Sequence, residues 1–301
     1  MTQNTTMKFA VLPPVRAGVC SDPDWMVGFS RHAEDCGFES IVLVEHPVVI
    51  SDYTSRYPYA SSGRMPLADD CAIPDPIDVL AFIAAATTRL QLATGVLVLP
   101  AHHPVIMAKR LATVDALSKG RVRLCIGVGW MREELEACGI DFASRGRRTD
   151  ECIDVMRVLW ADTEPEGATF EGEFFRFSHA HTHPKPHRSG GVPVHVGGHS
   201  TASIRRAARR GDGWHPLGLR GDELKTALGL LRQEASAAGR DPGSIELTLT
   251  GVSTGTTPET LAELDEMGVD RLVVTCLQPD LEAAKEEMSH VAETVGLTPT
   301  G

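Results

Sequence analysis

The chain has 301 residues, of which 42% are hydrophobic and 23% are charged, a composition typical of a globular protein with a full core. Its formal net charge of -11 argues against nucleic acid or an anionic membrane as a partner, because both need a basic surface. The amino terminus is polar, and no apolar stretch reaches the roughly 20 residues of a membrane helix. The seven cysteines are odd in number and form no CxxC pair, which predicts a reducing, cytoplasmic environment.

Short apolar runs alternate with helical patterns along the whole chain. Strands are expected at residues 8–12, 41–44, 90–99, 122–128, 194–196, 214–217, 245–250 and 271–274. Helices are expected at residues 24–36, 75–87, 104–118, 132–138, 149–160, 201–210, 222–238, 258–267 and 281–295. Apolar strands without polar alternation suit a parallel sheet that is covered on both faces. Eight such strands predict an α/β fold with one (β/α)8 barrel domain, a TIM barrel, over residues 1–301.

Two segments interrupt this alternation. The loop of residues 45–76 is unusually long, which is common for loops that serve a function. It contains Tyr53, Tyr57 and Tyr59, so it is a candidate lid that would exclude water from a site. We interpret residues 164–191 as an insertion between the fourth and fifth strands, with a hairpin over residues 169–177.

The loops that follow the strands build the active site in barrels of this kind, so the residues just after each strand are the first candidates. After the second, fourth, fifth and sixth strands these candidates are, in order, Glu45 and His46; Gly127, Gly129, Trp130, Glu133 and Glu134; Gly197, Gly198, His199, Ser200 and Thr201; and Trp214.

The segment after the fifth strand is the most informative of these. Gly197 and Gly198 let the backbone approach a ligand closely, and Ser200 and Thr201 open a helix whose exposed N–H groups favour a phosphate. A turn followed by an ordinary helix cap, with Ser200 as the cap, explains the same residues. The pair Gly127 and Gly129 lacks the third glycine of a dinucleotide fingerprint, and close approach of a planar ligand suits it as well.

Histidines offer two further hypotheses. His46 can move a proton near neutral pH or hydrogen-bond a bound ring, although a histidine that merely caps the barrel is an equal alternative. His179, His181 and His183 form an HxHxH pattern that metal-dependent hydrolases also use. Because this pattern lies in the insertion beside prolines, a loop without metal is the other interpretation.

Six pieces of the chain together match a known family. They are residues 33–46 (AEDCGFESIVLVEH), 92–121, 126–141 (IGVGWMREELEACGID), 148–160, 170–177 and 193–216. In this order and spacing they resemble the luciferase-like oxidoreductases, which use FMN or the deazaflavin coenzyme F420. The resemblance implies the eight-stranded barrel and a non-prolyl cis peptide between Gly95 and Val96, beneath the cofactor ring.

The resemblance also implies roles for individual residues. His46 would lie near the reactive edge of the ring, and Glu133 or Glu134 would supply an acid near the site. Gly197 and Gly198 would form part of a phosphate cradle. The residues expected to bind the cofactor are Glu45, His46, Gly95, Val96, Gly127, Gly129, Trp130, Gly197, Gly198, His199, Ser200, Thr201 and Trp214. The anionic deazaflavin tail would need cations at the barrel mouth, for which the candidates are Arg132, Arg145, Arg147, Arg148 and Arg205.

Residues 53–66, followed by Asp75 and Pro76, resemble a branch of the family usually assigned to F420. We therefore expect an oxidoreductase that transfers a hydride between F420 and a small organic substrate, with a monooxygenase that uses reduced FMN as the alternative. The resemblance further implies a homodimer and a separate reductase that supplies reduced cofactor. A metal-dependent hydrolase built on the histidine pattern and a non-catalytic cofactor binder are the alternatives from other classes.

Overall fold

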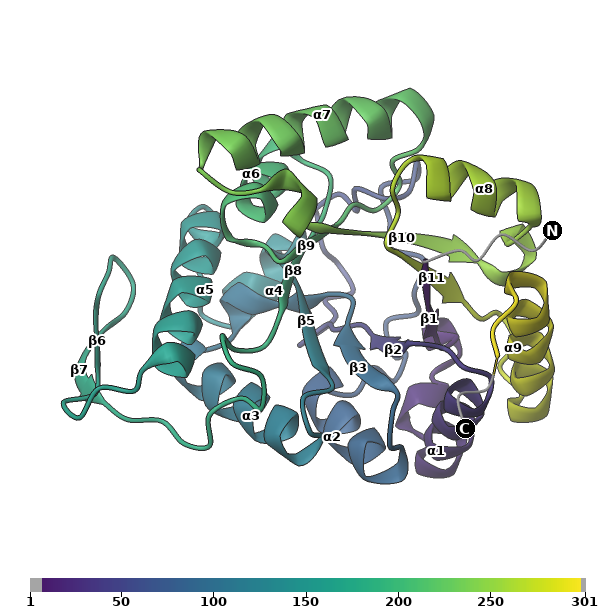
Figure 1. Cartoon of the computed structure of the whole chain (residues 1–301), viewed down its shortest axis with the longest axis horizontal. Coiled ribbons are helices and arrows are strands. Elements are labelled where there is room, and N and C mark those ends of the chain that lie inside the picture. The colour runs from purple at the N-terminus through teal and green to yellow at the C-terminus, as the bar shows by residue number, and fades with distance from the viewer. Residues whose placement is uncertain (1–6, 299–301) are drawn as a thin grey trace.

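The computed structural model describes residues 7–298, in which a closed parallel barrel is surrounded by helices (Figure 1). The strands pair in the order β3-β2-β1-β11-β10-β9-β8-β5-β4, and a further pairing of β3 with β5 closes the ring. Their bounds are β1 Lys8–Leu12, β2 Ser40–Leu43, β3 Gln91–Thr94, β4 Leu97–Val98, β5 Val122–Gly127, β8 Val194–Gly197, β9 Gly213–His215, β10 Glu246–Val252 and β11 Arg271–Thr275. Because β3 and β4 are two parts of one interrupted strand, the predicted (β/α)8 barrel is confirmed.

The helices follow the strands as the periodicity predicts. Their bounds are α1 Pro23–Asp35, α2 Pro76–Ala86, α3 Pro104–Leu117, α4 Arg132–Ala137, α5 Arg145–Ala161, α6 Thr201–Arg210, α7 Gly221–Ala237, α8 Pro258–Glu266 and α9 Leu281–Val295. Asp22, Asp75 and Ser200 cap α1, α2 and α6 by accepting backbone N–H groups. Within residues 7–298, no helix is long and apolar enough to cross a membrane.

The third strand differs from the continuous run of residues 90–99 that the sequence predicts. A cis peptide joins Gly95 to Val96 and separates β3 from β4, as the family resemblance implies. Thr94 bridges the interruption, because its Oγ1 accepts a hydrogen bond from the N–H of Cys125 at 2.9 Å and donates one to the Cys125 carbonyl at 2.7 Å. The side chain thus replaces part of the strand ladder, a substitution that an apolar pattern cannot reveal.

The insertion contains the predicted hairpin, which consists of β6 (Ala168–Glu171) and β7 (Arg176–Ala180) and projects beside α5 (Figure 1). The Glu151 carboxylate on α5 accepts hydrogen bonds from the backbone N–H groups of Glu173, Phe174 and Phe175. One carboxylate therefore ties the turn of the hairpin to the barrel.

A network of ion pairs closes the amino-terminal end of the barrel. The guanidinium of Arg271, 2% exposed, lies 3.0 Å from Glu39 and 2.9 Å from Glu246. Arg123 lies 2.8 Å from the same Glu39, and Lys8 pairs with Glu246 near the surface. Charged side chains thus fill the end of the barrel opposite the carboxyl ends of the strands.

Candidate active site

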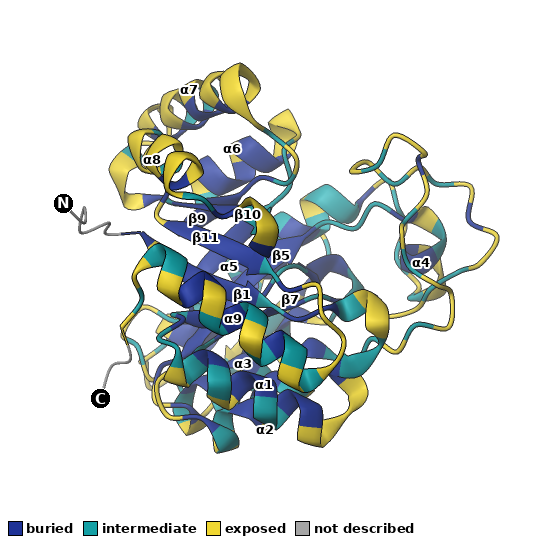
Figure 2. Ribbon diagram, turned by 90° about the vertical axis from the view of Figure 1, so that its right-hand side faces the viewer, coloured by how far each residue is buried: buried dark blue, intermediate teal, exposed yellow. Residues whose placement is uncertain are grey.

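The carboxyl ends of the strands are covered by the loop between β2 and α2 and by α4. Figure 2 shows α4 beyond one end of the barrel, amid loops that are only partly buried. The sequence predicts the active site at this end of the barrel. Residues from loops far apart in the chain lie together here.

His46 and Glu134 form a hydrogen-bonded pair at this mouth. His46 follows β2 directly, and its Nδ1 lies 3.0 Å from Oε1 of Glu134 on α4. The Glu134 side chain is fully buried, whereas the His46 side chain remains 14% exposed. A carboxylate at Nδ1 favours the tautomer with its proton there, which leaves Nε2 free to exchange a proton. Of the two predicted acids, Glu134 is therefore the one that contacts the histidine.

Glu133 points the other way, toward the loop that covers the mouth. Its Oε1 accepts hydrogen bonds from the N–H and hydroxyl of Thr54 at 2.6 and 2.8 Å, and its Oε2 accepts one from the Ser55 hydroxyl at 2.7 Å. Although partial desolvation raises the pKa of Glu133, these hydrogen bonds lower it to about 2. Glu133 is thus an ionised anchor for the loop.

Glu45, predicted to bind cofactor, is a buried brace for the third strand. Its Oε2 accepts a hydrogen bond from the Val98 N–H at 2.6 Å, and its Oε1 lies 2.8 Å from Nε2 of His102. Since both carboxylate oxygens have partners in the protein, the side chain holds β4 in place after the cis peptide.

Three glycines around the cis peptide make room for neighbouring side chains. A Cβ at Gly127 would lie 2.7 Å from Cγ2 of Val96, and one at Gly197 would lie 2.5 Å from its Cγ1. A Cβ at Gly95 would collide with Cγ1 of Val42. Gly127 and Gly197 were expected to let a ligand approach, but their immediate role is to seat Val96, which forms an apolar floor for the mouth.

The loop after β8 is shaped as the glycine-rich motif predicts. Gly198 has a φ of +99°, and the Nδ1 of His199 lies 2.7 Å from the Leu217 carbonyl. Ser200 caps α6 through the Ser203 N–H, and Ser200 and Thr201 are exposed. The helix-cap interpretation is therefore correct, while the exposed start of α6 still suits an anion.

Trp214, predicted to bind the cofactor, lies on β9. Its side chain is fully buried and belongs to the main hydrophobic core. Its indole N–H donates a hydrogen bond to the Gly198 carbonyl at 2.9 Å. This hydrogen bond therefore helps to hold the loop after β8 in place.

An aromatic chain, which the sequence does not reveal, crosses the mouth. The ring of Trp130 lies 6.3 Å from that of His46 and 5.2 Å from that of Tyr57. Tyr57 contacts Tyr59 at 5.3 Å, and Tyr59 contacts His199 at 5.4 Å, all with edge-to-face geometry. These rings link the end of β2 to the end of β8 through the covering loop. The tyrosines signal a lid in the sequence, but their partners come from distant strands.

A second histidine lies inside the barrel. The Nε2 of His215 is 2.8 Å from the Thr250 hydroxyl, and its Nδ1 is 3.8 Å from the Cys125 thiol. Burial, reinforced by the charges of Arg123 and Arg271, lowers the pKa of His215 to about 4. The imidazole therefore stays neutral near pH 7. Side chains alternate along a strand, so His215 and Trp214 point to opposite faces of β9. Only the closed barrel shows that His215 is the one that points inward.

The candidate arginines differ in their partners. Arg132, Arg147 and Arg205 are paired with glutamates, at 3.2, 2.9 and 2.8 Å, and Arg148 donates to the Pro100 carbonyl at 3.1 Å. Arg132 and Arg145 also flank the Phe142 ring, with guanidinium carbons 4.4 and 3.6 Å from its centroid. Arg145 also donates to the Gly129 carbonyl at 3.2 Å, which places it next to the mouth.

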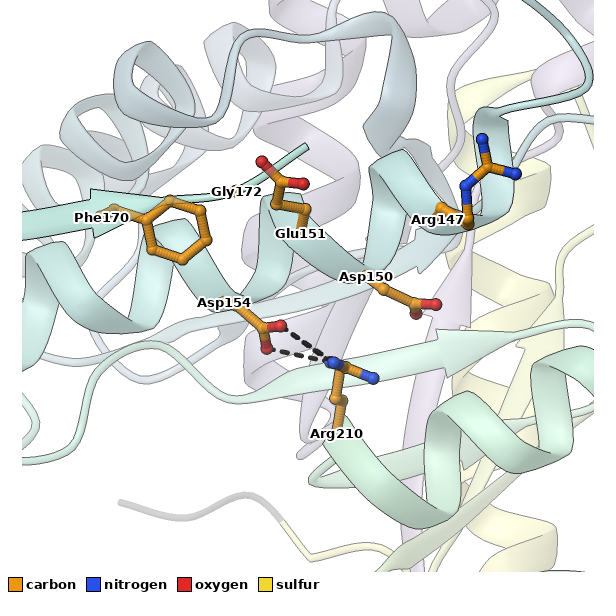
Figure 3. Close-up of a pocket in the computed structure, with 7 residues that line it drawn as sticks. All are labelled: Arg147, Asp150, Glu151, Asp154, Phe170, Gly172 and Arg210. Carbon is orange, nitrogen blue, oxygen red and sulfur yellow. Dashed lines mark hydrogen bonds and ion pairs between the residues drawn. The ribbon is translucent and has the colours of Figure 1, made fainter. Parts of the chain in front are cut away.

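Two other parts of the surface offer no comparable chemistry. His179 lies on the exposed hairpin and meets only the Glu166 carbonyl through Nδ1, and residues 7–298 contain no cluster of three metal-ligating side chains. A groove of about 360 Å³ lies between α5, α6 and β6 (Figure 3). There the Arg210 guanidinium is bonded to both Asp154 oxygens, at 2.9 and 3.0 Å. The paired charges of this groove explain its structure without a ligand.

Comparison with known proteins agrees with this geometry. A family model described as luciferase-like monooxygenase matches residues 7–290. An uncharacterized protein of Mycobacterium tuberculosis is 31% identical over 258 residues, which cover 86% of this chain and 87% of that protein. An F420-dependent glucose-6-phosphate dehydrogenase of Segniliparus rotundus is 32% identical over 233 residues, which cover 75% of this chain and 63% of that enzyme. A monooxygenase structure from Streptomyces bottropensis shares the fold with a TM-score of 0.76 at 22% identity, covering 96% of this chain and 98% of that one. The chain therefore belongs to the luciferase-like monooxygenase family.

Proposed function

We propose that this oxidoreductase transfers a hydride between coenzyme F420 and a small organic alcohol or carbonyl compound, with His46 as the proton-exchanging residue. The observation that carries the proposal is the hydrogen-bonded His46–Glu134 pair at the mouth of the barrel. The similarity to an F420-dependent dehydrogenase supports the choice of cofactor. We further propose that the chain is one domain and acts in the cytoplasm, and the free state of its seven described cysteines supports that location.

The residues at the mouth fit such a cofactor. Val96 offers an apolar floor for a planar ring, and the exposed N–H groups at Ser200 and Thr201 suit a phosphate. Arg132 and Arg145 are cations near the mouth that suit an anionic tail. In the proposal the ring contacts Gly95, Val96, Gly129 and Trp130, the loop from Gly197 to Thr201 holds the phosphate, and Glu45, Gly127 and Trp214 act by shaping these surfaces.

His46 exchanges the substrate proton at Nε2. His46 would take the hydroxyl proton of an alcohol at Nε2, and F420, when bound, would supply the redox chemistry by accepting a hydride from the alcohol carbon. Glu134 holds the ring through Nδ1 and stabilises the imidazolium that forms. The aromatic chain above the mouth keeps water away from the transferred hydride.

The second candidate is a monooxygenase that uses reduced FMN supplied by a separate reductase. The description of the matching family and the shared fold with the monooxygenase of Streptomyces bottropensis favour this alternative. The same apolar, covered mouth would then exclude water from the site.

Parallel titrations with oxidised F420 and with FMN separate these two functions. Quenching of cofactor fluorescence measures the binding of each cofactor. We expect micromolar binding of F420 and at least about tenfold weaker binding of FMN, because in the proposal only the F420 tail contacts Arg132 and Arg145. The Arg145→Ala variant is expected to weaken F420 but not FMN. Preference for FMN would replace the proposal with the monooxygenase, and oxygen uptake would test it. Binding of neither would contradict both.

We also propose a homodimer formed through α2 and α3. Phe82 on α2 and Ile106 and Leu117 on α3 are large apolar side chains that are 47, 61 and 75% exposed, on neighbouring helices. We expect light scattering after size-exclusion chromatography to give twice the chain mass, and Ile106→Glu to give a monomer. Leu277→Glu, which alters another exposed leucine far from these helices, is the matched control. A wild-type monomer would contradict the proposal.

A further inference from the structure

Residues 53–65 of the loop between β2 and α2 form a small unit folded on itself, which we call the lid. The Tyr53 hydroxyl accepts a hydrogen bond from the Met65 N–H at 2.8 Å, and Arg64 donates to the Tyr53 carbonyl at 2.8 Å. The Tyr57 N–H bonds the Gly63 carbonyl at 2.8 Å. Because these bonds lie within the lid, it can move over the mouth as a unit.

The lid is attached to α4 by Thr54 and Ser55. Both donate hydrogen bonds to the Glu133 carboxylate, and the Ser55 hydroxyl oxygen accepts one from the Arg132 N–H at 2.9 Å. Arg132 is the first residue of α4, and Met131 before it has no side-chain acceptor for a cap. The lid therefore supplies the N-terminal cap that this six-residue helix lacks.

The next residue of α4 connects this attachment to the active site. Neighbouring helical residues point in different directions, so Glu133 reaches the lid while Glu134 reaches His46. We propose that Glu133 is the latch of the lid, and that closure of the lid completes α4 and thereby positions His46. The second part rests on the proposed function of His46, whereas the latch does not.

The physical basis is the marginal stability of a short helix. A helix of six residues is unstable alone and depends on its caps and contacts. When the lid opens, the Arg132 N–H loses its acceptor and Glu133 loses its four side-chain and backbone donors on Thr54 and Ser55. Glu134 then loses the rigid support that aims its carboxylate at Nδ1. His46 is therefore correctly oriented only beneath a closed lid, from which water is excluded.

Limited proteolysis of the full chain without cofactor tests the latch. Arg56 and Arg64 place two trypsin sites in the lid, and cleavage there tracks the fraction of open lid. We expect Glu133→Ala and Ser55→Ala each to speed cleavage after these residues by about tenfold or more, because charge-assisted hydrogen bonds are lost. Glu136→Ala is the matched control, since it removes an exposed acid of the same helix that pairs with the Arg132 side chain and not with the lid. Cleavage in the lid at the wild-type rate in both variants would overturn the latch.

Two measurements keep this test specific. Thermal unfolding midpoints that match the wild type show that faster cleavage reports lid opening rather than general unfolding, and Glu133→Gln, which keeps the shape, gives an intermediate rate if the charge matters. Cleavage that accelerates equally at sites outside residues 53–65 would overturn the latch, because the variant would then open the whole fold.

The tautomer of His46 tests the positioning role. Nitrogen-15 imidazole spectra, with the His46 signal identified through His46→Asn, are expected to show the proton on Nδ1 in the wild type and mixed tautomers in Ser55→Ala. This readout needs no cofactor and no turnover. An unchanged tautomer in a variant whose lid opens would overturn the coupling and leave the latch intact. Failure of F420 and FMN to bind would contradict the proposed function without affecting either result.

Discussion

Replacement of His46 by alanine is expected to lower kcat of the cofactor-dependent reaction by about 10²- to 10⁴-fold, the usual contribution of a general acid or base. The loss arises because Nε2 is the exchangeable site that Glu134 leaves free at the mouth. Cofactor affinity should stay within about threefold, since a hydrogen bond at the ring edge adds little to total binding. Steady-state kinetics and fluorescence titration of the same preparation measure the two quantities.

The matched variants show whether the pair acts as a unit. Glu134→Gln is expected to reduce kcat about tenfold or more, because the amide cannot stabilise an imidazolium as a carboxylate does. The double variant should lose little beyond His46→Ala alone, since Glu134 acts through the histidine. His290→Ala, on the exposed side of α9, is the control and should be silent. A His46→Ala enzyme that keeps its kcat would remove His46 from the mechanism and leave the proton to water or to another group.

Replacement of Arg271 by alanine is expected to cost about 3–5 kcal/mol of the free energy of unfolding, because it removes the buried centre of the network and leaves two partly buried carboxylates without that partner. Arg271 is 2% exposed and holds Glu39 and Glu246 at once. The matched control is Lys8→Ala, which removes an exposed partner of the same Glu246 and should cost no more than about 1 kcal/mol. Urea unfolding measures both, and equal losses in the two variants would contradict the buried network as a source of stability.

The same network sets the response to acid. Burial raises the pKa of Glu39 and Glu246, but Arg123 and Arg271 lower the pKa of Glu39 to about 2, and Lys8 and Arg271 lower that of Glu246 to about 2. Because these folded values lie below the ordinary value of 4.5, the network stabilises the fold at higher pH and loses this effect as the pH falls from 4.5 toward 2. The free energy of unfolding of the wild type should therefore fall as the pH is lowered from 4.5 toward 2, and this fall should be smaller in Arg271→Ala.

The barrel itself could be predicted because its signal is local. Each strand is a short apolar run followed by a helix with its own cap, as with Asp75 before α2. The loops after the strands of such a barrel meet at one end, so the sequence alone predicts that His46, Trp130 and Gly198 lie in the same region. Family resemblance added the cis peptide between Gly95 and Val96, which residue patterns alone do not encode.

The details of the site depended on angles that a sequence does not contain. Glu133 and Glu134 are adjacent, and only the rotation of α4 relative to a histidine 88 residues away decides which one bonds it. The phase of a three-residue strand such as β9 is ambiguous in the sequence, and only the structure shows that Trp214 packs in the main hydrophobic core. Glu45 was placed among the cofactor ligands, but an unexpected partner, His102, occupies its carboxylate.

The seat of Val96 between Gly127 and Gly197 has a consequence for how this enzyme can diverge. One side chain, inserted between two glycines from different strands, sets the depth of the surface at this point of the mouth. A smaller residue at position 96 would lower that surface into a pit lined by glycine, whereas a larger one would have no space to enter. Variation in ligand shape can therefore begin at position 96 without altering the chain elsewhere, but additions at positions 127 or 197 require a simultaneous loss at position 96.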